Sequence, residues 1–217
     1  MNGRIGIVHA TRLSIEPLEA AFGRHWPKAP RTHLLDDSLL QDRRAAGKLT
    51  PALYARIAAL ANHSYDSGAR FILFSCSAFG PAIEAARSQM DVPVLKPYEA
   101  MVEAALDKGP RIVALSTFAP TLTELKEEVE AVAAKRGIKL QLRTHAAEAA
   151  LPALEAGRAD EHDAIVAKAA EQFEDCDALM LAQYSTAPAA RLIRAVPGRT
   201  VLTSPDTAVE LLKKRLG

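Results

Sequence analysis

Short apolar runs alternate with longer stretches of helical periodicity along the whole chain. Seven apolar runs predict strands, at 4–11, 70–76, 92–95, 111–117, 139–143, 178–183 and 199–203. Apolar residues spaced three and four apart predict helices between them, at 16–24, 51–62, 81–90, 97–109, 122–136, 160–173, from 188 onward and at 207–217. Apolar strands that alternate with helices are typical of parallel sheets covered on both faces, so the pattern predicts an α/β fold.

The second half of the chain repeats the first at an offset of 107 positions. The matches fall at equivalent strand and helix starts: Arg4-Ile5 with Arg111-Ile112, Pro81-Ala82 with Pro188-Ala189, and Val94-Leu95 with Val201-Leu202. We interpret the chain as two pseudo-symmetric lobes, each a short parallel β-sheet of about four strands flanked by helices. Ligands of such sheets bind beyond the carboxyl ends of the strands, so we expect an active-site cleft between the lobes.

Composition and charge argue against two classes of partner, nucleic acids and membranes. The 27 basic and 26 acidic residues nearly cancel, and no basic stripe is interleaved with aromatic residues, so no nucleic acid is expected as a partner. No apolar run approaches the roughly 20 residues of a membrane span, and the first residues lack signal-peptide architecture, so no membrane partner is expected. Two cysteines do not make a disulfide framework, and we expect a cytoplasmic protein with reduced thiols.

Cys76 stands where the predicted strand 70–76 ends, shortly before the helix led by Pro81. A thiol near a helix N-terminus has a lowered pKa, because unpaired backbone amides and the helix dipole stabilise the thiolate. A thiolate there can remove a proton from the carbon beside a carboxylate or attack a carbonyl, and the residues leave both reactions open. The competing interpretation is an inert, buried cysteine. It fits Cys176 better, so we assign Cys176 no chemistry.

The sequence lacks the motifs that would indicate metal, nucleotide or serine-hydrolase chemistry. The six histidines show no metal-ligand spacing, and phosphate-loop, dinucleotide-binding and serine-hydrolase motifs are absent, so we expect no metal and no nucleotide. His9 lies at a predicted strand end, where it either contacts a ligand or hydrogen-bonds backbone. The charged stretch 33–54 predicts a solvated face, or alternatively a flap whose Arg43 or Lys48 meets an anionic substrate.

Two loop sequences and the duplicated layout carry a family resemblance. With FSCSAFGPAIEAAR at 74–87 and LAQYSTAPAARLIR at 181–194, the chain resembles the aspartate/glutamate/hydantoin racemase superfamily, which includes allantoin racemases, maleate isomerases and arylmalonate decarboxylases. The resemblance implies chemistry without a cofactor beside the carboxylate of a small substrate, with one cysteine on each side of the reacting carbon. It also implies a homo-oligomer and crossed terminal helices, with lobes at 1–96 plus 205–217 and at 97–204.

Carried over residue by residue, the resemblance implies that Cys76 is the first catalytic cysteine. It implies substrate-binding positions in the loops and at the strand ends, at His9, Thr11, Ser77, Ala78, Thr117, Ser185 and Thr186. The second cysteine of the family falls at Gln183, whose amide is neither acid nor base near neutral pH. The adjacent Tyr184 carries a hydroxyl that is better suited to donating a proton than to accepting one.

The missing second thiol leaves three interpretations. In the first, Cys76 works with Tyr184, a water or another residue, and racemisation survives. In the second, Cys76 alone handles one proton or one covalent bond, as in a decarboxylase, an isomerase or a lyase. In the third, the protein binds a small acid without turning it over. We favour an enzyme acting at the α-carbon of an amino acid, a hydantoin or a related acid, with Cys76 as base or nucleophile and Gln183 as hydrogen-bond donor.

Overall fold

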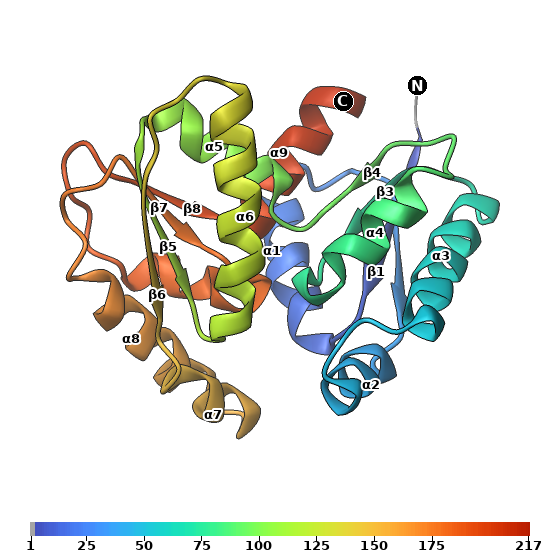
Figure 1. Ribbon diagram of the computed structural model, residues 1–217, viewed down its shortest axis with the longest axis horizontal. Helices are drawn as coiled ribbons and strands as arrows, with labels where there is room; N and C mark the ends of the chain where they lie inside the picture. The colour runs from blue at the N-terminus through green and yellow to red at the C-terminus, as the bar shows by residue number, and fades with distance from the viewer. Residues whose placement is uncertain (1–2) are drawn as a thin grey trace. The chain divides into compact units, whose positions relative to one another are not determined.

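The computed structural model describes residues 3–217, which form two compact units (Figure 1). One unit comprises the chain up to Pro97 together with Val209–Gly217, and the other comprises Tyr98–Ala208. Each unit carries its own sheet and its own hydrophobic core, so each is described by itself.

The first unit is built on a parallel sheet of four strands. These are Arg4–His9 (β1), Arg31–Leu35 (β2), Ala69–Phe74 (β3) and Val94–Leu95 (β4). They pair in the order β2-β1-β3-β4, so β1 and β3 are central and β2 is an edge strand. The helices, with η marking 3₁₀ segments, are Arg12–Ser14 (η1), Ile15–His25 (α1), Ser38–Ala46 (α2), Pro51–Asp66 (α3), Ser77–Phe79 (η2) and Gly80–Arg87 (α4).

The second unit is also built on a four-stranded parallel sheet. Its strands are Arg111–Ser116 (β5), Gln141–Ala146 (β6), Ala178–Leu181 (β7) and Thr200–Thr203 (β8). They pair in the order β6-β5-β7-β8. Its helices are Glu99–Lys108 (α5), Ala119–Lys135 (α6), Ala150–Glu155 (α7), Ala159–Ala170 (α8) and Tyr184–Leu192 (η3). The last helix, Ser204–Leu216 (α9), starts in this unit, and its residues from Val209 onward belong to the first.

The two sheets repeat each other in strand order, and the pairs β1-β3 and β3-β4 repeat in register as β5-β7 and β7-β8. Beyond the last ladder pair of the central strands, the Ser75 amide donates to the Val8 carbonyl oxygen at 3.0 Å. In the second unit the Ala182 amide donates to the Leu115 carbonyl oxygen at 2.8 Å, and both residues lie 107 positions further along the chain. The predicted fold class, α/β with two parallel sheets flanked by helices, is therefore confirmed.

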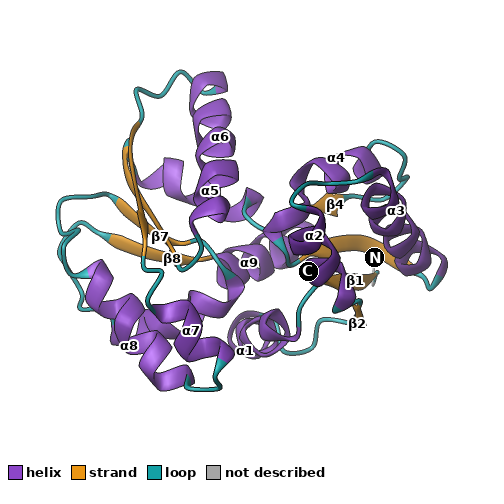
Figure 2. Cartoon of the chain, turned by 60° about the horizontal axis from the view of Figure 1, so that its bottom comes forward, coloured by secondary structure: helices purple, strands orange, loops and turns teal. Residues whose placement is uncertain are grey.

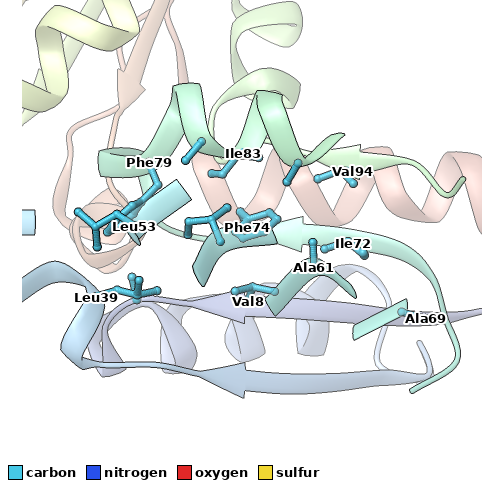
Figure 3. Packing of buried hydrophobic residues seen from close by; sticks show 14 residues of the cluster. Val8, Leu39, Leu53, Ala61, Ala69, Ile72, Phe74, Phe79, Ile83 and Val94 are labelled. Atoms are coloured by element: carbon cyan, nitrogen blue, oxygen red, sulfur yellow. The ribbon is translucent and has the colours of Figure 1, made fainter. Parts of the chain in front are cut away.

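The core of the first unit lies between its sheet and the helices α2, α3 and α4. Figure 3 shows side chains of these helices, such as Leu53 and Ile83, gathered over Val8, Ile72 and Phe74 of the central strands. Helix α3 begins where the sequence predicts it, because Thr50 caps it by accepting a hydrogen bond from the Leu53 amide. The central strands β1 and β3 are buried along most of their length, and this packing fixes the position of their carboxyl ends.

The second sheet is covered on both faces, as Figure 2 shows for α5 and α6 on one side and α8 on the other. Alternate residues of β7 separate the two layers, because successive side chains of a strand point to opposite faces. Met180 packs with residues of α5 and α6, whereas Leu179 and Leu181 pack with residues of α7 and α8. This double burial explains why β7 is a continuous apolar run in the sequence.

Two stretches differ from the predicted elements. The charged stretch 33–54 includes most of β2 and all of α2, and Leu39 anchors α2 in the core, whereas most of the stretch is exposed or half-buried; the alternative of a flap stays a prediction. The predicted helix from residue 188 is instead a 3₁₀ segment that begins at Tyr184 and contains Pro188. Proline has no backbone N–H to continue an α-helical ladder, which favours the tighter and shorter 3₁₀ form.

Candidate functional site

Cys76 and Gln183 occupy the same structural position in their respective units. Cys76 follows β3 and precedes η2 with φ −120° and ψ 123°, and Gln183 follows β7 and precedes η3 with φ −131° and ψ 147°. Both side chains are partly buried. Both are therefore presented at the carboxyl end of a central strand, where ligands of parallel sheets bind.

The side-chain amide of Gln183 is fixed in one orientation. Its Oε1 atom accepts hydrogen bonds from the Ser116 hydroxyl at 2.9 Å, the Thr117 amide at 2.7 Å and the Thr117 hydroxyl at 2.8 Å. A backbone amide donates only, so the atom that it contacts must be the oxygen and not the nitrogen. The Nε2 group therefore points away from these donors, and it forms no hydrogen bond within residues 3–217. Gln183 presents N–H donors and no acid or base.

Three other predicted residues of the second unit are buried supports of this loop. The side chains of Thr117 and Thr186 are almost fully buried, and the Thr186 hydroxyl donates to the Gln183 carbonyl oxygen at 2.8 Å. Tyr184 is also buried, and burial raises the pKa of its hydroxyl well above the ordinary value. Its oxygen has no hydrogen-bond partner in the described chain. Roles for these residues in contacting substrate stay predictions.

The loop serines are the more accessible of the predicted contacts. Ser77 and Ala78 follow Cys76 at the start of η2, Ser185 lies in the first turn of η3, and all are partly exposed. The first N–H groups of a helix have no partner inside the helix, so these turns offer donors in addition to the two hydroxyls. Thr11 caps η1 instead, with its hydroxyl accepting a hydrogen bond from the Leu13 amide at 3.3 Å.

His9 lies at the end of β1 beside the residue that precedes Cys76. Its Nδ1 atom lies 2.8 Å from the hydroxyl oxygens of both Ser14 and Ser75, and those oxygens are 2.8 Å from each other. The His9 side chain is fully buried, and both of its ring nitrogens face protein partners. A ligand would contact a ring nitrogen of His9 only by replacing one of these partners, so that role stays a prediction. The alternative prediction was a hydrogen bond to backbone, and the ring bonds side chains instead.

The other nitrogen of His9 leads to the surface of the unit. Its Nε2 atom lies 2.9 Å from Nδ1 of His33, whose Nε2 atom lies 2.9 Å from Oε1 of Glu19. Arg31 then donates to both oxygens of Glu19 at 2.6 Å. The hydrogen bonds from Arg31 are the largest of the effects that lower the pKa of Glu19, so this carboxyl is ionised at neutral pH.

Burial sets the charge state of His9. Desolvation by burial, and to a smaller extent the neighbouring His33, lower the pKa of His9 from an ordinary value of 6.5 to about 4, against a smaller opposite effect of Glu19. His9 is therefore neutral near pH 7. Cys176 behaves as the sequence predicts for an inert thiol, since it is 2% exposed and burial raises its pKa.

The partners of His9 were not found from the sequence. Ser14 ends η1, Glu19 lies on α1, His33 lies on β2 and Ser75 follows β3, and the pairing of β1 with β2 and β3 brings His33 and Ser75 to His9. The sequence held one signal of this network, which is the histidine at position 33 in a stretch that we predict to be a solvated face.

Residues 3–217 contain neither a cluster of metal-binding side chains nor a helix suited to crossing a membrane. Within residues 3–217 no group of three or more His, Cys, Asp and Glu side chains lies close enough together to hold a metal ion. In the same range, none of the helices has the length and apolar character required to cross a membrane.

The sequence of the chain matches the family model described as Asp/Glu/Hydantoin racemase over residues 7–212. The chain belongs to this family. No curated protein sequence matches the chain. Among solved structures, glutamate racemase from Thermus thermophilus in complex with β-chloro-D-alanine is 21% identical to this racemase-family chain, with a TM-score of 0.68. That match covers 99% of this chain and 80% of the Thermus chain.

Two further structures show the range of proteins that share the racemase fold. An aspartate racemase homologue from Pyrococcus horikoshii OT3 is 16% identical, with a TM-score of 0.67 and 99% of both chains covered. An arylmalonate decarboxylase double mutant, with one cysteine introduced and another replaced by serine, is 18% identical, with a TM-score of 0.57. Its match covers 99% of this chain and 93% of the decarboxylase chain. At such identities the likeness shows the fold alone.

Proposed function

We propose that the protein is a cofactor-independent enzyme that moves a proton at the carbon beside the carboxylate of a small acid, with Cys76 as its single thiol base. The observation that carries this proposal is the contrast between the two equivalent loops. One presents a thiol, and the other presents an amide whose oxygen is fully engaged. Membership of the Asp/Glu/hydantoin racemase family supports the substrate class, which is an amino acid, a hydantoin or a related acid.

The proposed step conserves atoms and charge. The Cys76 thiolate takes the α-proton, so a C–H bond breaks, an S–H bond forms, and the electron pair spreads over the substrate carboxylate as an enolate. Hydrogen-bond donors that are already aimed at the developing charge stabilise such an intermediate without reorganisation. We assign that role to the Nε2 group of Gln183 and to the hydroxyls of Ser77 and Ser185. The same thiol then returns a proton to the carbon.

A single thiol also suits decarboxylation, which is the second candidate. Loss of CO₂ leaves the electron pair on the α-carbon, and the Cys76 thiol supplies the one proton that completes the product. Only one acid group is required, and Gln183 offers none. Racemisation needs a second acid on the opposite face. Tyr184 is a poor candidate for it because burial raises the pKa of its hydroxyl.

The test is proton NMR in D₂O with a panel of amino acids, hydantoins and substituted malonates. We expect Cys76-dependent deuterium at the α-carbon of at least one compound, by exchange or with release of CO₂. Cys176→Ala is the matched control, since that thiol is buried and should leave the rate unchanged. In Cys76→Ala the rate should fall by about 100-fold or more, as for loss of a general base.

A binding protein without turnover is the result that would overturn the proposal. It would show no exchange and no CO₂ across the panel, together with binding of one of these acids that survives in Cys76→Ala. Cytoplasmic location and a homo-oligomer remain predictions, and gel filtration with light scattering tests the second of them.

A further inference from the structure

We infer that Ser75, His9, His33 and Glu19 form a proton relay that connects the loop bearing Cys76 with solvent. The relay rests on four contacts within the first unit, of 2.8 Å from Ser75 to His9, 2.9 Å from His9 to His33, 2.9 Å from His33 to Glu19, and the paired bonds from Arg31 to Glu19. Its inner end is the residue next to Cys76. At its outer end the His33 side chain is 27% exposed.

Donor and acceptor chemistry fixes the direction of the chain in its neutral form. The Glu19 carboxylate only accepts, so Nε2 of His33 carries a proton. A neutral His33 then has a bare Nδ1, which accepts from the Nε2–H of His9. The bare Nδ1 of His9 accepts in turn from a serine hydroxyl. Every hydrogen bond therefore points from the strand end toward Glu19.

Addition of one proton reverses the inner bonds. A proton that reaches Nδ1 of His9 through the Ser75 hydroxyl releases the Nε2 proton of His9 to Nδ1 of His33. His33 becomes an imidazolium held by Glu19, and His9 stays neutral but changes its tautomer from Nε2–H to Nδ1–H. One proton enters at the strand end and one positive charge appears at His33, from which the proton leaves to solvent water.

The groups around the chain place the charge on His33 rather than on His9. Of the two histidines, Glu19 on α1 hydrogen-bonds His33, and Arg31 on β2 is the charged side chain that hydrogen-bonds Glu19. Burial disfavours a charge on His9, whose pKa is lowered to about 4. Asp36, whose amide bonds the His9 carbonyl oxygen, directs its carboxylate to Arg56 instead, and Arg12 pairs with Asp37. His9 is therefore a neutral bridge.

The function of the relay rests on the proposed function of Cys76. A thiol that removes an α-proton must lose that proton before the next exchange with solvent, and Ser75, the inner end of the relay, is adjacent to Cys76 in the sequence. The relay supplies a route for this proton that does not pass through bound substrate. His9 and His33 are thus positioning and proton-transfer residues that act through Ser75 rather than on the substrate.

The direct test is ¹⁵N NMR of histidine-labelled protein across pH 5 to 8, which reports the tautomer and charge of each ring. We expect His9 to be neutral and Nε2–H wherever His33 is neutral, and neutral and Nδ1–H wherever His33 is cationic. In His33→Gln, the glutamine oxygen accepts from His9 and its amide donates to Glu19, so His9 should stay in the Nε2–H form at every pH. A His9 tautomer that does not depend on the charge state of His33 in the wild type would overturn the relay.

A matched control and an activity measurement separate this inference from the proposed function. His25 contacts Glu210 at 3.4 Å with 29% side-chain exposure, similar to His33, so His25→Gln should leave the tautomer of His9 unchanged. Once a substrate is known, His33→Gln should lower the rate of solvent deuterium exchange at least 10-fold with KM unchanged, and added imidazole should restore it. A coupled tautomer switch without any Cys76-dependent exchange would leave the relay standing and remove the proposed function, whereas an unchanged exchange rate in His33→Gln would remove the relay alone.

Discussion

Cys76 and Gln183 hold equivalent positions 107 residues apart, each extended in backbone and each directly before a 3₁₀ segment at the end of a central strand. The repeat therefore keeps the backbone of the two loops alike and changes their chemistry. A thiol can exchange a proton near neutral pH, and a carboxamide can only form hydrogen bonds. In the proposed mechanism, this asymmetry leaves one thiol where a symmetric racemase would use two.

The proposed role of Gln183 in catalysis can be separated from its contribution to the stability of the loop. In Gln183→Glu a carboxylate keeps an acceptor for the donors of Ser116 and Thr117, but the N–H donors are lost. We expect stability to change by less than about 1 kcal/mol and the exchange rate to fall by about 100-fold, the usual cost of losing one donor to a developing oxyanion. Chemical denaturation and the D₂O exchange assay measure the two effects.

Gln183→Leu is the contrasting variant. It removes the acceptor as well and takes away the hydrogen-bond partner of the buried Thr117 amide and hydroxyl, whereas the Ser116 hydroxyl keeps the Phe118 carbonyl oxygen as an acceptor. We expect a loss of about 2 kcal/mol or more in the free energy of unfolding. Equal stability of the Glu and Leu variants would show that the three hydrogen bonds to Oε1 do not hold the amide in place.

The two thiols should differ sharply in reactivity. Cys76 is partly exposed, whereas Cys176 is 2% exposed with a pKa raised by burial. Because the thiolate is the form that reacts, brief treatment of the native protein with iodoacetamide should alkylate Cys76 and spare Cys176 until the protein is unfolded. Peptide mass spectrometry reads out both sites, and faster labelling of Cys176 would contradict the assignment of chemistry to Cys76.

His9 gives the stability of the protein a definite dependence on pH. Its pKa is lowered to about 4 in the folded state, so below pH 6.5 the unfolded chain binds more protons than the folded chain. Stability should rise as pH increases from about 4 to 6.5, with a total contribution on the order of 3 kcal/mol. Urea unfolding between pH 5 and 6.5, above the titration of most carboxylates, should show this slope in the wild type and a smaller one in His9→Asn.

Gly6 marks a close approach of α3 to β1. A methyl group added there would lie 2.9 Å from Cβ of Ser64 and 3.0 Å from Cβ of Ala69, so Gly6→Ala should destabilise the protein by about 1–3 kcal/mol. Gly23 on α1 is the control, because an added methyl meets nothing within 4 Å. Gly23→Ala should stabilise by about 0.5–1 kcal/mol through helix propensity. Thermal unfolding of both variants decides whether the approach is as tight as described.

The sequence predicted the parts of the fold that are buried on both sides. β1, β3, β5 and β7 are apolar along most of their length, and such runs can hardly be anything but central strands. The edge strand β2 was not predicted, because its residues Arg31–Leu35 are all exposed or half-buried and resemble a charged surface loop. The short helix α7 has too few residues for a periodic signal.

The equivalence of Cys76 and Gln183 was predictable from the sequence, but the hydrogen-bond partners around the candidate site were not. Cys76 and Gln183 follow from the repeat, because an offset in sequence becomes an equivalence in structure. The contact from His9 to His33 and Glu19 joins three elements, and no local pattern encodes it. The orientation of the Gln183 amide likewise depends on Ser116 and Thr117 of a neighbouring strand end, which only the pairing of β5 with β7 reveals.

The single-thiol claim is tested most directly by the stereochemistry of exchange. One enantiomer of an active amino acid is incubated with the enzyme in D₂O, and chiral separation with mass spectrometry follows the label. A base on one face alone should return the same enantiomer carrying deuterium, with the opposite enantiomer absent from wild type and formed by Gln183→Cys. Deuterated opposite enantiomer made by the wild type as fast as label enters, or exchange that persists in Cys76→Ala, would contradict a single catalytic thiol at Cys76.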